Sequence, residues 1–259
     1  MIPLYGRAQM SKKGLICDPD AVSAVDKLDY PFERLKINKK TTVLLTLRAI
    51  AIDELTSAFL KENPHSIVIY LGCGLDSRAM RLGFPSDHWY DLDFPEVIAV
   101  KKQIFPQNDH YSLLGYSVTD LEWLNKININ DLPVLVIAEG LLMYLPEKEV
   151  KALIVAMKEK FKDVDFVFDA YSKTTAEYAK YQPSLKRTGA AILYGIDHPA
   201  EIEGYARGIA HLKTVYLTDR GLINRLGAAD RFLFGLAGKF KKAREAHRIF
   251  VFRLLEPLR

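Results

Sequence analysis

The chain has 259 residues, of which 49% are hydrophobic and 26% charged, with a formal net charge of +4. This composition is ordinary for a globular protein that is large enough to bury a sizeable core. No apolar run approaches the length of a membrane-spanning helix. The sequence also lacks a basic tail of the kind that binds nucleic acid. We therefore expect a single cytoplasmic domain over residues 1–259, with neither a membrane nor a nucleic acid as partner. Its oligomeric state stays open.

The two cysteines, Cys17 and Cys73, are far apart in the sequence and lack the spacing of metal ligands. We expect neither a disulfide framework nor a bound metal. Cys73 is interpreted as a small residue in a turn rather than as a nucleophile, because no histidine lies beside it. A local basic cluster is predicted to be a solvated helix face, and it consists of Lys239, Lys241, Lys242 and Arg244.

The N-terminal part of the chain changes character after residue 36. Residues 1–30 show weak periodicity, whereas apolar residues recur at steps of three and four over 36–60, which predicts a helix. Arg48 lies in this helix, either facing solvent or gripping a ligand carboxylate with its planar fork. Arg7 has the same two interpretations, as an exposed residue or as a ligand for an anion.

Beyond residue 64 the predicted strands and helices alternate. Strands are expected near 66–71, 87–92, 110–116, 133–138, 164–170, 213–218 and 247–254. Helices are expected near 77–82, 95–104, 120–126, 147–161 and 219–228. This order predicts an α/β fold of the Rossmann-like, doubly wound type, with a mostly parallel seven-stranded sheet and helices on both faces. Residues 172–212, interrupted by Pro and Gly, are predicted to be a helical lid insertion that contacts the substrate.

The first predicted strand leads into the turn Gly72-Cys73-Gly74, and Asp76 or Ser77 can cap the helix that follows. Open α/β sheets build nucleotide sites in this way, because glycines let backbone N–H groups approach the ligand. An acidic residue is expected about 20 positions later to hold the ribose hydroxyls. Asp93 lies 19 positions after Gly74 (93 − 74), at the end of the second strand.

Asp76 bears on the kind of nucleotide. A carboxylate beside the turn would repel a pyrophosphate, which such turns otherwise attract. A ligand with a ribose, an amino acid end and a positive centre suits the turn better, and S-adenosylmethionine is such a ligand. A dinucleotide is the alternative, but Ser77 only approximates the third small residue of its fingerprint.

Two further strand ends carry polar residues. Ser117-Val118-Thr119-Asp120 follows the third strand, where Ser117 or Asp120 could accept from an adenine amino group while Val118 packs on the ring. Asp120 could instead cap the next helix. Glu139 closes an apolar strand, which is costly without a partner. We interpret it as facing the positive side of the cofactor, the alternative being a solvated strand-end acid.

Several motifs in this order resemble the leucine carboxyl methyltransferase family and its bacterial relatives, the polyketide-type O-methyltransferases. They include Asp18-Pro19, Leu92-Asp93-Phe94-Pro95 and the run Ala138-Glu139-Gly140-Leu141-Leu142-Met143-Tyr144-Leu145. The resemblance implies an S-adenosylmethionine-dependent methyltransferase that acts on a carboxyl or hydroxyl group of a small molecule or of a C-terminal carboxylate. It also implies that the helical segment 1–60 covers the cofactor.

The resemblance further implies roles for individual residues. The methionyl carboxylate would be held by Arg7 and Arg48, and its surroundings would include Gly72, Gly74 and Glu139. Cys73 stands where relatives often carry Ala. Asp93 would hold the ribose, and Ser117 and Val118 the adenine.

The catalytic residues stay unknown. A carboxylate acceptor needs no base, and a hydroxyl acceptor needs one. His198 and His211 are available, but surface roles suit them better. A dinucleotide-dependent oxidoreductase is a second hypothesis, although the nearest approach to a catalytic Tyr-x-x-x-Lys motif, Tyr144 with Lys148, follows a proline in a predicted loop. A non-catalytic binding protein with the methyltransferase fold is a third.

Overall fold

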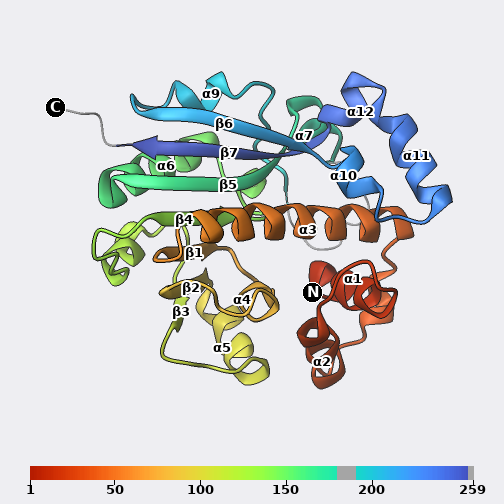
Figure 1. Cartoon of the computed structure of the whole chain (residues 1–259), viewed down its shortest axis with the longest axis horizontal. Helices are drawn as coiled ribbons and strands as arrows, with labels where there is room; N and C mark the ends of the chain where they lie inside the picture. The colour runs from red at the N-terminus through yellow and green to blue at the C-terminus, as the bar shows by residue number, and fades with distance from the viewer. Residues whose placement is uncertain (180–190, 256–259) are drawn as a thin grey trace.

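The computed structural model of the chain describes residues 1–179 and 191–255 (Figure 1). Its centre is a seven-stranded sheet with the order β3-β2-β1-β4-β5-β7-β6. The strands are β1 (Ile67–Leu71), β2 (His88–Asp93), β3 (Tyr111–Gly115), β4 (Val134–Ala138), β5 (Asp163–Tyr171), β6 (Ile209–Tyr216) and β7 (His247–Leu255). Neighbouring strands are parallel except around β7, which is antiparallel to β5 and β6. The predicted mostly parallel sheet is confirmed.

Helices cover both faces of the sheet because its central strands are apolar on both sides. All five residues of β1 are buried. Its odd-numbered side chains pack with α6 (Glu147–Phe161) and the 3-10 helix η2 (Leu121–Lys126), whereas Val68 and Tyr70 pack with the long helix α3 (Lys39–Glu62) on the other face. This continuous burial is what the parallel arrangement requires.

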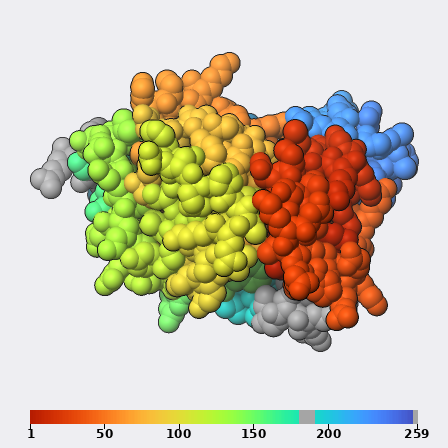
Figure 2. Space-filling view, turned by 90° about the horizontal axis from the view of Figure 1, so that it is seen from below, coloured from red at the N-terminus to blue at the C-terminus, as the bar shows by residue number. Residues whose placement is uncertain are grey.

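Residues 1–30 form two helices despite their weak periodicity, α1 (Ile2–Lys12) and α2 (Pro19–Lys27). The inward face of α1 includes Arg7 beside apolar residues, which is why its apolar pattern is weak. Asp18 caps α2 by accepting a hydrogen bond from the N–H of Ala21 at 3.0 Å. The two helices share a core with the end of α5 (Pro95–Ile104), and Figure 2 shows them in red beside the yellow surface of this region.

The described ranges contain eight further helices. They are η1 (Phe32–Leu35), α4 (Arg78–Arg81), η3 (Leu142–Tyr144), α7 (Lys173–Ala179), α9 (Ala200–Glu203), α10 (Arg220–Ile223), α11 (Ala228–Gly238) and α12 (Lys241–Glu245). The helix expected at 219–228 is therefore two helices, α10 and α11, and the one expected at 120–126 is the 3-10 helix η2. No helix within 1–179 or 191–255 combines the length and the apolar character needed to cross a membrane.

The strand expected at 213–218 begins earlier, at Ile209. As an edge strand β6 pairs with β7 alone and keeps several side chains exposed, so it lacks the apolar run of the central strands. Its first residues belong to the sheet although they fall inside the predicted insertion 172–212. The rest of that insertion includes α7 and α9, and residues 180–190 lie outside the described residues.

Candidate active site

The turn after β1 and the end of β2 are joined at the carboxyl edge of the sheet. Gly72 and Gly74 have φ values of +60° and +52°, which other residues rarely adopt. Asp93 accepts hydrogen bonds from the N–H groups of Gly74 and Phe94, both at 2.7 Å. Its carboxylate is only partly buried. The glycine turn thus fixes a carboxylate that remains accessible, as a ribose site requires.

Ser117 and Val118 follow β3, the strand that pairs with β2. Gly115 at the end of β3 is paired with Asp93, and the N–H of Tyr116 donates to the carbonyl of Asp93 at 3.0 Å. Val118 is buried, while Ser117 is partly exposed and lies within 2.9 Å of the hydroxyl of Thr119. A polar hydroxyl and an apolar side chain therefore follow the strand that pairs with the end of β2.

Asp120 takes the capping role, because its carboxylate accepts from the N–H of Glu122 at 3.3 Å. Cys73 is buried and its Sγ lies 3.5 Å from the carbonyl of Gly74. Burial raises the pKa of the Cys73 thiol well above its usual range. A thiol held protonated in this way is a poor nucleophile, which agrees with a packing role.

Glu139 lies between two arginines rather than in solvent. Its Oε1 accepts from Nε of Arg48 at 3.0 Å, and its Oε2 accepts from Nη2 of Arg78 at 2.5 Å. The guanidinium of Arg48 also donates to Oδ2 of Asp169 at 2.9 Å. Burial by itself would lower the pKa of Arg48, but the carboxylates of Asp169 and Glu139 raise it. The predicted solvent-facing alternatives for Glu139 and Arg48 are therefore wrong.

Asp76 is also buried among cations. Its carboxylate accepts from the hydroxyl of Tyr70 and from Arg81, both at 3.0 Å, and pairs with Arg7 at 3.3 Å. Burial opposes its ionisation, but Arg7, Arg81 and Arg78 hold the pKa of Asp76 well below its usual range. The expectation that Asp76 repels a pyrophosphate is weakened, since its charge is neutralised inside the protein.

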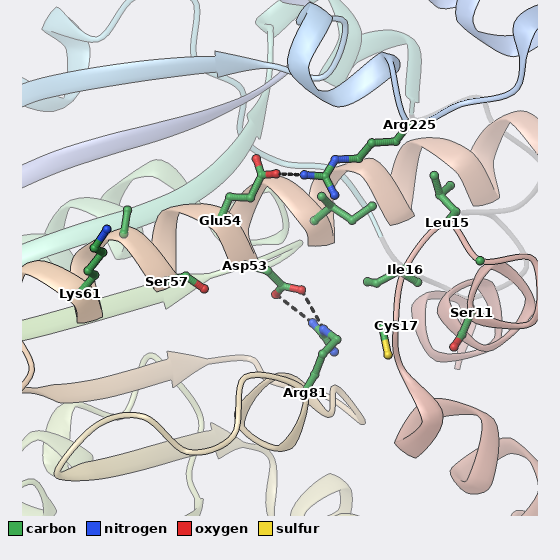
Figure 3. A pocket seen from close by; sticks show the side chains of 13 residues that line it. Ser11, Leu15, Ile16, Cys17, Asp53, Glu54, Ser57, Lys61, Arg81 and Arg225 are labelled. Carbon is green, nitrogen blue, oxygen red and sulfur yellow. Dashed lines mark hydrogen bonds and ion pairs between the residues drawn. The ribbon is translucent and has the colours of Figure 1, made fainter.

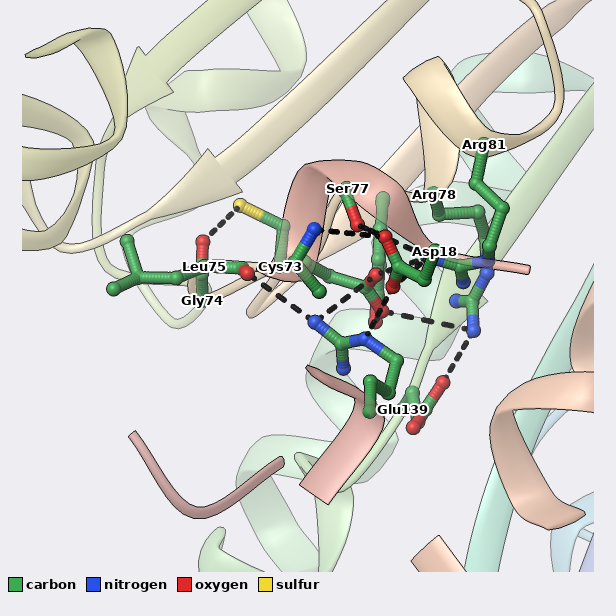
Figure 4. A network of polar contacts seen from close by, with 12 residues as sticks. Asp18, Cys73, Gly74, Leu75, Ser77, Arg78, Arg81 and Glu139 are labelled. Carbon is green, nitrogen blue, oxygen red and sulfur yellow. Dashed lines mark hydrogen bonds and ion pairs between the residues drawn. The ribbon is translucent and has the colours of Figure 1, made fainter. Parts of the chain in front are cut away.

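Arg7 connects α1 with the glycine turn, and Figure 4 labels two of its partners, Asp18 and Leu75. Its Nε pairs with Asp18 at 3.1 Å, and its Nη2 donates to the carbonyl of Leu75 at 3.2 Å. Arg7 is only 3% exposed, so the interpretation of an exposed N-terminal arginine is wrong. Asp18 also accepts from the hydroxyl of Ser77 at 2.6 Å. The N-terminal helices are thus tied to the turn by buried ionic contacts.

Sequence reasoning missed Asp169 and His247. Asp169 is fully buried near the carboxyl end of β5, where it accepts from the N–H of Gly140 and contacts Nε2 of His247, both at 2.5 Å. Burial opposes its ionisation, yet Arg48 and His247 hold the pKa of Asp169 well below its usual range. Asp169 could have been found from the pattern that identified Glu139, which is an apolar strand that ends in a carboxylate.

The two histidines considered as bases occupy different places in the fold. His211 is the third residue of β6 and pairs with Phe252 near the far end of β7, so it lies towards the amino edge of the sheet. His198 lies two residues before α9, and its N–H donates to Glu201 at 2.9 Å. The nearby Ile196 donates to the carbonyl of Tyr171, at the carboxyl end of β5, at 2.8 Å. Neither residue is brought to the glycine turn.

Two features test whether a ligand such as S-adenosylmethionine fits beside the turn. Nη1 of Arg78 is buried and has no hydrogen-bond partner in the part of the chain that the structure describes. A Cβ on Gly74 would meet no heavy atom within 4 Å, so there is space at the turn. An unpaired guanidinium N–H suits a ligand carboxylate, and Asp93 suits ribose hydroxyls. The donor set fits this cofactor.

A separate cleft of about 760 Å³ lies between the 11–17 segment and α3 (Figure 3). Its wall includes Asp53, whose carboxylate accepts from Nε of Arg81 at 2.7 Å and from Nε of Arg78 at 2.7 Å. On its rim Arg225 pairs with Glu54. The cleft therefore borders the arginine network at Asp53. The residues that line it do not include those of the glycine turn.

Comparisons with known proteins agree with this geometry. The family model of leucine carboxyl methyltransferase matches residues 19–158. The tetracenomycin polyketide synthesis O-methyltransferase TcmP of Streptomyces glaucescens is 31% identical over 233 residues, covering 90% of this chain and 86% of that protein. The S-adenosyl-L-methionine-dependent methyltransferase dpfgK of Gibberella zeae is 28% identical over 93% of this chain and 89% of its own.

Solved structures show the same fold at low identity. A DUF574 family protein from Streptomyces avermitilis aligns with a TM-score of 0.60 and 12% identity, covering 82% of this chain and 84% of its own. The magnesium protoporphyrin IX methyltransferase of Synechocystis aligns with a TM-score of 0.54 and 14% identity, covering 86% and 92%.

The doubly wound sheet, with its glycine turn and acidic second strand, is of the methyltransferase type. The chain belongs to the leucine carboxyl methyltransferase family and is an S-adenosylmethionine-dependent methyltransferase. This membership favours the first of the three hypotheses from the sequence over the oxidoreductase and the non-catalytic binding protein.

Proposed function

We propose that the carboxyl edge of the sheet binds S-adenosylmethionine and that the enzyme methylates an oxygen atom of its acceptor. The hydrogen bond from Gly74 to Asp93, at 2.7 Å, carries the proposal, because it joins the glycine turn to the acid that would bind the ribose. Ser117 and Val118 would receive the adenine, since they follow the strand next to Asp93.

The methionyl end would lie along Gly72, Cys73 and Gly74, towards the arginine network. Arg78 offers an unpaired buried N–H there, and Arg7 contacts the turn at Leu75. Arg48, Asp76 and Glu139 would act through this network, because their charges already pair with one another or with neighbouring arginines and Asp169. We infer that they shape the site and set its charge, rather than bind the ligand directly.

The sulfonium of the bound cofactor supplies a good leaving group for an in-line displacement at its methyl carbon. The protein therefore has to align the acceptor oxygen with that carbon and keep water away. Residues 1–60 support this role, since α1 and α2 cover the edge and Arg7 ties them to the turn. Oxygen as acceptor is favoured by the names of the family and of TcmP.

Transfer of a labelled methyl group from S-adenosylmethionine to fractions of a cell extract tests this proposal. We expect label to appear in a product, and mild base then separates methyl esters, which release it, from methyl ethers, which keep it. The matched control is Gly74→Asp, which places a carboxylate where the cofactor would approach. Absence of transfer by the parent enzyme, or equal transfer by the variant, would contradict the proposal. Label attached to nitrogen or carbon would overturn the oxygen acceptor.

A further inference from the structure

The segment from α10 to α12 presents an apolar and basic surface that methyl transfer does not require. We call it the α11–α12 surface. Its apolar members are Phe232, Leu233, Leu236 and Phe240, which are 74%, 52%, 44% and 62% exposed. Its basic members, all exposed, are Arg220, Arg231, Lys239, Lys241, Lys242 and Arg244.

The apolar residues lie on the outer side of α11. Phe232 and Leu236 are four residues apart and lie on one side of α11, with Leu233 beside them. Phe240 follows the end of α11, at the residue before α12. The only residue of α11 that is buried is Phe234, which anchors the helix to the core. Packing against the core thus fixes one side of α11, and large apolar side chains on the other side are exposed to solvent. A group of exposed apolar side chains is typical of an interaction surface.

The basic residues are not neutralised within the protein. None of the six forms an ion pair with another residue of the described ranges 1–179 and 191–255. Nearby charges behave differently, since Asp230 pairs with Lys39 and Arg225 pairs with Glu54. Arg231 donates to two backbone carbonyls, and Arg244 lies over the ring of Tyr216. The surface therefore keeps a strong positive charge.

The two kinds of side chain meet in a hollow of about 440 Å³ between α10, α11 and α12. Four cations and one acid line it together with the apolar Phe232 and Leu236, and these charged residues are Arg220, Arg231, Lys239, Arg244 and Asp219. Cations beside protruding aromatic and aliphatic groups match a ligand that carries an anionic head next to a hydrocarbon chain.

We propose that the α11–α12 surface docks on a bilayer that contains anionic lipids. Phe232, Leu233, Leu236 and Phe240 would enter the boundary between head groups and acyl chains, and the six cations would contact the phosphates. Three protruding side chains of α11 and the Phe240 ring that follows it offer less apolar area than a stable protein–protein interface needs. The charge complementarity and the small apolar area together favour a lipid surface over a second copy of the chain.

This proposal changes two expectations from the sequence. Lys239, Lys241, Lys242 and Arg244 were predicted to be a solvated face, and no membrane partner was expected. Sequence alone does not reveal that the neighbouring Phe and Leu residues of α11 are exposed, since a helix with that pattern is normally packed by its apolar side.

The position of the surface gives the docking a consequence for the enzyme. α10 follows the carboxyl end of β6, which runs parallel to β5, and α12 leads into His247 beside Asp169. In Figure 1 the three helices lie at the end of the sheet where β6 and β5 terminate. Docking would therefore turn the carboxyl edge, and with it the proposed methyl-transfer site, towards the bilayer.

Co-sedimentation of the full chain with vesicles tests the docking without any methyl-transfer assay. One set of vesicles contains phosphatidylcholine alone, and the other also contains phosphatidylglycerol. We expect binding to the second set only, and weaker binding as salt shortens the Debye length from about 10 Å at 0.1 M to about 3 Å at 1 M.

Two double variants separate the apolar and the charged parts. Phe232→Ser with Phe240→Ser, and Lys241→Glu with Lys242→Glu, should each weaken binding to the anionic vesicles at least about tenfold. The matched control is Lys102→Glu with Lys148→Glu, which makes the same charge change on exposed residues of α5 and α6. It should keep most of the binding.

Failure of the parent protein to bind the anionic vesicles would overturn the docking proposal, as would equal losses in the control and the charge variant. Self-association that the Phe232→Ser and Phe240→Ser changes abolish, without vesicle binding, would assign the surface to a second copy of the chain. None of these outcomes depends on cofactor binding, so they leave the proposed function untouched.

Discussion

Replacing Asp93 with Ala should weaken binding of S-adenosylmethionine about 100-fold. Two hydrogen bonds from ribose hydroxyls to a carboxylate are lost, each contributing about 1.5 kcal/mol, and 1.4 kcal/mol corresponds to a factor of about ten in affinity. The variant also removes the acceptor for the N–H groups of Gly74 and Phe94, so the turn loses its fixed position. Calorimetric titration with the cofactor measures the change.

Asp120→Ala is the matched control for this prediction. It removes the same charge from the neighbouring loop, where Asp120 is exposed and caps η2. Its affinity for S-adenosylmethionine should stay within about threefold of the parent value, since loss of a cap acts mainly on local stability. An Asp93→Ala variant that binds as tightly as Asp120→Ala would remove Asp93 from the site.

Replacing Arg48 with Met should lower the free energy of unfolding by about 3–5 kcal/mol, which is the usual cost of removing one partner from a buried ion pair. Arg48 is buried and pairs with both Glu139 and Asp169, so the variant takes one cationic partner from each of two buried carboxylates, which keep Arg78 and His247. Met is chosen because it nearly fills the volume of the arginine stem. Urea unfolding followed by circular dichroism measures the loss.

Arg225→Met provides the comparison, because its ion pair with Glu54 is exposed to solvent at 47% and 52%. Exposed pairs contribute about 0–1 kcal/mol, so this variant should unfold at nearly the parent urea concentration. If Arg48→Met is no less stable than Arg225→Met, the ion pairs of Arg48 do not hold α3 to the carboxyl ends of β4 and β5.

The sheet was predictable from the sequence because its central strands are continuous apolar runs that end in glycine or acidic residues. Gly72, Gly74, Asp93 and Glu139 are such ends, and parallel strands bring their carboxyl ends to one edge. The same rule applied to Asp169 would have added it to the site. Only the first residues of β6, 209–212, were missed, because an edge strand needs no apolar run.

The arrangement of charges was not predictable in the same way. Arg7 and Arg48 lie far apart in the sequence, and their burial depends on carboxylates from other elements, Asp18 for one and Asp169 for the other. A single sequence gives no pairing between such residues. From the sequence alone, an arginine in a helix is therefore predicted to lie on the surface, and only the fold shows its buried partner.

A crystal structure of the protein with S-adenosylhomocysteine tests the cofactor assignment most directly. We expect the ribose hydroxyls within about 2.6–3.2 Å of the Asp93 carboxylate, and the homocysteine end along Gly72 and Gly74. Electron density for the ligand in the cleft between the 11–17 segment and α3, with none at the glycine turn, would contradict the proposed cofactor site.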